Sequence, residues 1–383
     1  MNHAARGPST VLMKLACLFS SLGTASLLVG AVACGSASLS ETPAPPDGGE
    51  PVTSDGAPSS PEKDGGLPDA LPPVTCTPPT QDVPGAVVIG APSTAKDSFT
   101  TLLAASAVAV YVSVEDAKTS TSRLLVYPRT AGACATEVPL PAGFVKVFFV
   151  VAHDDGSADV LAGKQPGFAA DILHQATPTA ALTPSVTIPN VIALLASEGQ
   201  LYVVDSTYQL RTVANGSSTV IADLASATIG GTQYRNYRTV GPYLLASLFD
   251  AAPALTTYAW DLRVRPLKAA PVRNAIKPMA VLAWDGTDLT YAYTVGTSLY
   301  VRSDVAGVES AVLYQGQGAG AWMVTGRLFV AEASGKALSL VGVAGATKTP
   351  LSATAFASIA TVDATGALAT LPDGRWASVP IAK

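Results

Sequence analysis

Two short apolar runs meet at a glycine turn in Ile192-Ala-Leu-Leu-Ala-Ser-Glu-Gly-Gln-Leu-Tyr-Val-Val-Asp205. Each run has the length and the Val, Leu and Tyr content of a β-strand, and the polar segment between them is typical of a tight turn. Two further runs follow at Gln209-Leu-Arg-Thr-Val213 and Ser218-Thr-Val-Ile-Ala222. This part of the chain therefore predicts four consecutive strands joined by short turns.

The same order of runs and turns recurs at regular intervals. The opening runs are spaced by 47, 47, 42, 41 and 37 residues. A period of roughly 40–50 residues is typical of the four-stranded blades of a β-propeller. With one more blade near Val108 to Pro139, we expect an all-β propeller of about seven four-stranded blades over residues 83–383. The opening runs begin near Val145, Ile192, Thr239, Val281, Trp322 and Ile359.

The last repeat is short, and this predicts how the ring closes. One small sheet cannot bury both of its faces, whereas radial packing of repeats covers the faces and leaves few open edges. We expect a strand around Ala86–Ile89 to complete the final blade. A pair of β-sandwich domains is the alternative fold. The dipeptides Trp260-Asp261 and Trp284-Asp285 lie 24 residues apart without matching Gly-His elements, so they do not indicate WD repeats.

The N-terminal segment has the organisation of an export signal. Arg6 and Lys14 precede an apolar run that ends in small residues, and no acidic residue occurs before Glu41. The stretch Leu27-Leu-Val-Gly-Ala-Val-Ala-Cys34 resembles a bacterial lipoprotein signal with its lipobox. The resemblance implies that residues 1–33 are removed and that Cys34 carries lipid. It implies a protein anchored to the cell envelope, with the outer membrane favoured because Gly35 and Ser36 follow the cysteine. An ordinary cleaved signal and an uncleaved anchor are the alternatives.

Residues 34–82 predict a disordered tether. The segment is rich in proline, glycine, serine and aspartate, and its apolar side chains are too sparse to repay the entropy of ordering. Such a segment is expected to act as a spacer between the lipid and the folded domain.

The balance of charge excludes one class of partner. Without residues 1–33 the chain carries 21 basic and 28 acidic residues, a net charge of −7. This argues against nucleic acid and against adhesion to anionic head groups. Beyond the signal no further membrane-spanning run is expected. Cys76 and Cys134 remain after processing, and an exported location favours a disulfide between them.

Few residues invite a reading as reactive or ligand-binding groups. His153 opens the acidic segment His153-Asp-Asp-Gly-Ser-Ala-Asp159, but the spacing does not fit an EF-hand, and Asp155-Gly156 indicates a hairpin turn instead. His174 is expected to stand alone. The glycine-rich segment Gly316–Gly320 precedes a strand rather than a helix, so we interpret it as an inter-blade loop and not as a phosphate cradle. The sequence thus predicts no catalytic residue, no metal and no cofactor.

Tyr234, Arg235, Tyr237 and Arg238 form an unusual aromatic and basic cluster. Such side chains are favoured at protein interfaces, so we predict a possible interface here, with a long surface loop as the alternative.

These observations favour a non-catalytic binding or scaffolding module at the cell envelope, with an envelope protein or glycan as partner. In architecture alone the chain resembles envelope propeller lipoproteins of the barrel-assembly accessory type. Fold does not imply function, so two alternatives stay open. One is a hydrolase or lyase acting on envelope polysaccharide. The other is capture of a small ligand in the central channel.

Overall fold

The computed structural model describes residues 77–90, 98–164, 170–224, 234–249, 255–268, 270–275, 279–306, 308–335 and 337–381. The signal expected over residues 1–33, Cys34, Cys76 and the tether up to residue 76 lie outside the described residues. Within these ranges the chain is built of β-strands and turns, and none of it forms a helix able to cross a membrane.

The described strands form five four-stranded sheets and one seven-stranded sheet. The first sheet contains β2 (Ser98–Ala105), β3 (Ala109–Asp116), β4 (Ser122–Pro128) and β5 (Thr136–Val138). The second contains β6 (Phe144–Ala152), β7 (Ala158–Lys164), β8 (Ala170–Gln175) and β9 (Thr183–Thr187). The third contains β10 (Val191–Ser197), β11 (Gln200–Asp205), β12 (Gln209–Ala214) and β13 (Ser217–Asp223). The fourth contains β14 (Tyr234–Val240), β15 (Tyr243–Phe249), β16 (Leu255–Asp261) and β17 (Ala270–Ala275).

The remaining strands form the seven-stranded sheet and the closing sheet. The seven-stranded sheet contains β18 (Met279–Trp284), β19 (Leu289–Val295), β20 (Ser298–Val305), β21 (Val308–Val324), β22 (Arg327–Ser334), β23 (Ala337–Ala344) and β24 (Thr347–Pro350). The closing sheet contains, in spatial order, β25 (Ser358–Asp363), β26 (Gly366–Thr370), β27 (Trp376–Val379) and β1 (Val87–Gly90). Each described pair of neighbouring strands is antiparallel.

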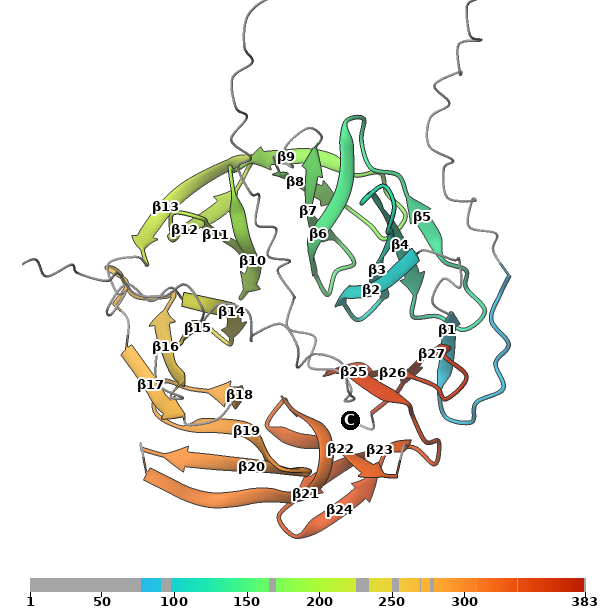
Figure 1. Cartoon of the computed structure of the whole chain (residues 1–383), viewed down its shortest axis with the longest axis vertical. Helices are drawn as coiled ribbons and strands as arrows, with labels where there is room; N and C mark the ends of the chain where they lie inside the picture. The colour runs from blue at the N-terminus through green and yellow to red at the C-terminus, as the bar shows by residue number, and fades with distance from the viewer. Residues whose placement is uncertain are drawn as a thin grey trace, which may run out of the picture.

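The sheets stand in a ring, with the opening strand of each toward the centre (Figure 1). Strand β6 lies between β2 and β10, and β14 lies between β10 and β18. Apolar side chains on the facing surfaces of successive sheets make the core: Tyr111 and Leu124 of the first sheet pack with Val160 and Leu173 of the second. The expectation of an all-β propeller is therefore confirmed, and the β-sandwich alternative is wrong.

The expectation of seven separate four-stranded blades needs correction. Five sheets are separate, but the chain makes one continuous sheet where two further blades were expected. The cause is β21, which pairs with β20 through residues 308–317 and with β22 through residues 318–324. The two halves of this sheet then pack against each other through a shared apolar cluster that includes Val301 and Val330. No turn separates the halves, because residues 308–324 stay extended.

The glycine-rich segment Gly316–Gly320 is the middle of β21, so its interpretation as an inter-blade loop is wrong. A Cβ at Gly318 would lie 2.8 Å from Leu299 Cδ2, and one at Gly320 would lie 2.9 Å from Trp322 Cη2. These contacts are too short for any side chain, so the alternating glycines let large neighbours lie across the strand. Close packing over the backbone, rather than turn formation, accounts for this glycine pattern.

The hairpin turn expected at Asp155-Gly156 is confirmed, and Asn215-Gly216 makes a second hairpin turn. Asp155-Gly156 joins β6 to β7, and Asn215-Gly216 joins β12 to β13 with φ of 50° and 72°. Both residues of the second pair are left-handed, as a type I′ turn requires. The Asp155 carboxylate fixes its turn by accepting hydrogen bonds from the Ser157 amide at 2.9 Å and the Ser157 hydroxyl at 2.7 Å.

The ring closes through the N-terminal strand, which confirms the sequence prediction. Val87 pairs with Ser378 and Val88 with Ala377, so β1 is the outer strand of a sheet otherwise made by the C-terminal end of the described chain. Val88 and Ile89 are 0% and 1% exposed. The Gln81 amide covers the outer edge of β1, because it donates to Val88 O at 2.7 Å and accepts from Val88 N at 3.0 Å.

A buried arginine joins the closing sheet to the first sheet. Arg129 follows β4, and its side chain is 4% exposed. Nη1 lies 2.7 Å from Asp363 Oδ2 and donates to Ser106 O at 2.8 Å, while Nε donates to Ser378 Oγ at 3.1 Å. The guanidinium therefore binds both sides of the joint, and its partners Asp363 and Ser378 lie more than 200 residues further along the chain.

Candidate functional site

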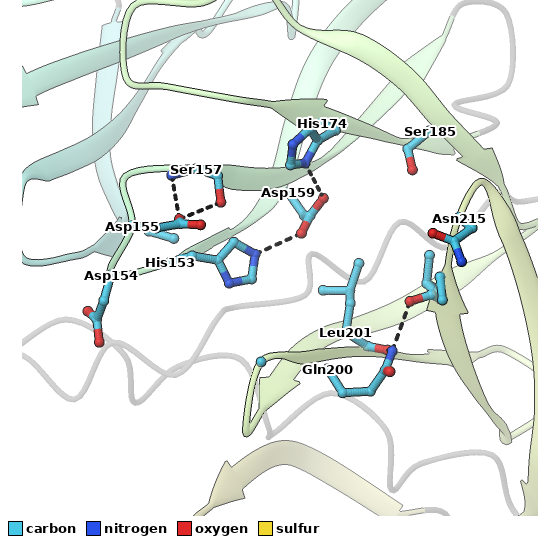
Figure 2. Close-up of a pocket in the computed structure, with 14 residues that line it drawn as sticks. His153, Asp154, Asp155, Ser157, Asp159, His174, Ser185, Gln200, Leu201 and Asn215 are labelled. Carbon is cyan, nitrogen blue, oxygen red and sulfur yellow. Dashed lines mark hydrogen bonds and ion pairs between the residues drawn. The ribbon is translucent and has the colours of Figure 1, made fainter.

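A polar cleft lies between the second and third sheets. Its volume is about 680 Å³. The walls are the β6–β7 turn, strands β8 and β9, and the β10–β11 and β12–β13 turns. Figure 2 shows the polar side chains that surround it. These are His153, Asp154, Asp155, Ser157, Asp159, His174, Ser185, Gln200 and Asn215.

Asp159 holds two imidazoles at one end of the cleft (Figure 2). His153 Nε2 lies 2.8 Å from Asp159 Oδ2, and His174 Nδ1 lies 3.1 Å from Asp159 Oδ1. The register explains the arrangement, since Asp159 of β7 pairs with His174 of β8 and His153 lies diagonally across the β6–β7 hairpin. The Asp159 side chain is 12% exposed, so the carboxylate depends on its partners.

The pKa values of this cluster shift in opposite directions. The hydrogen bond to Asp159 is the main cause that raises the pKa of His153, with burial acting against it. For Asp159, burial alone would raise the pKa, but the hydrogen bonds from His153 and His174 outweigh it and the pKa is lowered. Both shifts favour a charged carboxylate beside a protonated His153.

The stability of the fold should therefore depend on pH through His153. Because the pKa of His153 is raised above its ordinary value of 6.5, its contribution is fully present below 6.5 and is lost as pH rises through the raised pKa. The Asp159 contribution is present above 3.8 and is lost as pH falls through the lowered pKa. The combined contribution is greatest between these two values.

Denaturant unfolding of the wild type and a His153→Gln variant measures this effect. We expect the wild type to exceed the variant in unfolding free energy by more at about pH 5 than at about pH 8. A Ser157→Ala variant, altered in the same turn without removing a charge beside His153, controls for loss of turn geometry. A wild-type advantage over His153→Gln that stays constant across this range would contradict the prediction.

The other walls of the cleft are fixed by contacts between strands and sheets. Tyr111 of the first sheet donates its hydroxyl to Gly156 O at 3.5 Å and so supports the β6–β7 turn from behind. Gln200 Nε2 donates to Leu201 O at 3.0 Å and to Val213 O at 2.8 Å, which joins β11 to β12. Hydrogen bonds within and between the sheets therefore hold the walls of the cleft in place.

The cleft lacks the relay of a nucleophilic hydrolase among its described residues. The imidazole atoms that make hydrogen bonds face Asp159, and the Ser157 hydroxyl donates to Asp155 rather than to a histidine. In the described ranges no three His, Cys, Asp or Glu side chains are grouped so as to hold a metal ion. What this arrangement offers is hydrogen bonding and charge.

The structure places the predicted aromatic and basic cluster in a strand. Tyr234, Arg235, Tyr237 and Arg238 all belong to β14, so the alternative of a long surface loop is wrong. Tyr237 packs against the core between the third and fourth sheets, and burial lowers the pKa of Arg238. The interface itself stays a prediction. Cys134 is disulfide-bonded, and its pairing with Cys76 stays a prediction.

The sequence reasoning missed the His153–Asp159–His174 cluster. A hairpin at Asp155-Gly156 is enough to bring His153 near Asp159, so that half could have been found from the turn. The expectation that His174 stands alone is wrong. The contact between His174 and Asp159 depends on the register between β7 and β8, which the Pro166-Gly167 turn signal alone does not fix.

Comparison with known proteins identifies the fold and no family. No protein-family model and no curated protein matches the chain. The propeller domain of the Trilobed protease from Pyrococcus furiosus is similar, with a TM-score of 0.52 and 10% identity over 73% of this chain and 94% of that one. That propeller has an open velcro topology, whereas here β1 pairs with β27.

A second similar structure is prolyl oligopeptidase B from Galerina marginata, bound to a 35mer substrate. Its TM-score is 0.51, with 9% identity over 75% of this chain and 51% of that one. The chain thus spans about half the length of this peptidase. At identities this low, the structural similarity shows a shared β-propeller fold and nothing about activity.

Proposed function

We propose that this protein is a lipid-anchored lipoprotein of the cell envelope. Its propeller acts as a non-catalytic binding or scaffolding module. The single observation that supports a binding role best is the inter-sheet cleft. It combines a ligand-sized space with polar groups from five neighbouring segments. Within the described residues of the cleft, the Ser157 hydroxyl donates to Asp155 and not to an imidazole, and this favours binding over nucleophilic chemistry.

The anchor in this proposal is Cys34, which becomes the first residue when residues 1–33 are removed. The expected tether of residues 34–82 joins it to the propeller, and the end of that segment is part of the folded domain, since Gln81 bonds to Val88 and Asp82 to Arg375. Two or more acyl chains hold a protein stably on a membrane, whereas one is marginal. Attachment to the outer membrane is favoured by Gly35 and Ser36. The aromatic and basic residues of β14 are proposed as a contact for an envelope partner.

The number of blades in the ring is part of this proposal. We propose that the seven-stranded sheet takes the place of two blades, so that the ring has seven in all. The pairing of β21 with β20 by one half and β22 by the other supports this division.

Fractionation of cells that express the full chain tests the anchor. We expect the wild type and a Cys17→Ala variant to sediment with membranes, and a Cys34→Ala variant to become soluble, because only Cys34 ends the lipobox. Mass spectrometry of the mature N-terminus should find lipid on Cys34. A Cys34→Ala protein that still sediments would remove the anchor from the proposal.

In-cell crosslinking of the same strains tests the scaffolding role. One envelope protein should be crosslinked reproducibly to the wild type and lost from Cys34→Ala. Membrane attachment without any partner would leave the anchor standing and argue against a scaffold.

A further inference from the structure

The cleft between the second and third sheets has the size and construction of a small-molecule site. Its volume of about 680 Å³ lies within the range of roughly 300–1,000 Å³ usual for such sites. Its walls come from two sheets that are rigidly packed through Leu161, Ile172 and Val203. A site on such a frame needs little ordering when a ligand arrives.

The lining carries charges of both signs. Asp154 and Asp155 are exposed carboxylates on the β6–β7 turn, and no Lys or Arg is among the described residues that line the cleft. On the same wall, the contact with Asp159 favours the protonated form of His153. An anionic ligand would be repelled by the two carboxylates, and the attraction of a cationic ligand to them is reduced wherever His153 is protonated. A group that both donates and accepts hydrogen bonds suits this lining.

Several polar atoms at the cleft keep hydrogen-bonding capacity. Asp159 occupies only one nitrogen of each imidazole, and Gln200 uses its Nε2 within the sheet, which leaves Oε1 as an acceptor. Within the described residues, the Ser185 hydroxyl and the Asn215 amide make no side-chain hydrogen bond. Figure 2 shows these groups around one open space, with Asp154 and His153 opposite Asn215.

We propose that this cleft binds a neutral, hydroxyl-rich ligand of the kind an oligosaccharide presents, an inference that rests on the proposed binding role. Each sugar hydroxyl donates one hydrogen bond and accepts others, which matches carboxylate, amide and imidazole partners. Among the described residues, the lining contains no Phe, Tyr or Trp, so the proposed recognition comes from hydrogen bonds and not from stacking on such rings.

An array of neutral oligosaccharides probed with the full chain in detergent tests the inference. We expect at least one oligosaccharide to bind. Its affinity should fall about tenfold in Asn215→Ala and in Asp154→Ala, since each removes a hydrogen bond at the cleft. Thr297→Ala, an exposed change on the β19–β20 turn, is the matched control and should bind as the wild type does.

Three results would overturn the inference: no neutral oligosaccharide is retained, retention is equal in the cleft variants, or only tetralysine or tetraglutamate binds. Membrane fractionation of the same preparations separates this from the proposed function. If the protein sediments with membranes but binds no oligosaccharide, the proposed ligand class is wrong and the proposed anchor stands. If the protein is soluble but binds an oligosaccharide, only the proposed anchor is wrong.

Discussion

Deletion of residues 84–92 is expected to lower the melting temperature by on the order of 10 °C or more, since 1 kcal/mol moves the midpoint of a large domain by about 2–4 °C. The deletion removes β1, the outer strand of the closing sheet. It also removes Val88, which is buried between the closing and seven-stranded sheets, and Ile89, which is buried between the closing and first sheets. Loss of the Ile89 side chain alone should cost about 2–5 kcal/mol.

Differential scanning calorimetry of the deleted and intact proteins measures the effect. A deletion of equal length within the tether, residues 50–58, is the control and should leave the transition in place. Ile89→Ala should fall between the two proteins, because it keeps the strand and loses one buried side chain. An unchanged transition after deletion of residues 84–92 would mean that the ring is stable without its N-terminal strand.

Replacement of Arg129 by Met should cost about 3 kcal/mol of unfolding free energy, the lower end of the range for breaking a buried ion pair. The guanidinium is nearly inaccessible and serves Asp363, Ser378 and Ser106 at once. The lower end applies because Asp363 is 32% exposed and can be rehydrated when its partner is lost.

Arg263→Met is the matched control for this change. Arg263 also pairs with a turn aspartate, Asp261, at 2.8 Å, but its side chain is 54% exposed. Exposed ion pairs are screened by water and contribute little to stability, so this variant should differ little from the wild type. Denaturant titration gives both values, and equal losses in the two variants would show that the position of Arg129 at the ring joint has no special weight.

The repeat and the ring closure could be predicted because they depend on local patterns. The spacing of apolar runs fixes how many strands a segment can supply, and the short last repeat indicates a missing strand. The local pattern could not show whether the chain turns or stays extended at Gly316–Gly320. Glycine suits a turn and also a strand under a large side chain, and only the positions of Leu299 and Trp322 decide between them.

The cleft was harder to foresee than the fold. Its walls belong to different sheets, so Asn215 and His153 approach one another only after the ring is assembled. Likewise the burial of Arg129 depends on Asp363 and Ser378, which arrive from the far end of the sequence. Contacts of this kind leave no local pattern, because the sequence separation between partners is set by the whole topology.

The place of β1 in the ring decides where a mechanical load would act. If the proposed tether pulls on the domain, the load would first reach the segment held by Arg375, which binds Thr80 O and Asp82, and then β1. That strand also closes the ring, so a force that pulled β1 away from β27 would open the ring. A disulfide between Cys134 and Cys76 would carry the load past it into the first sheet, and the bond would then act as a strain relief.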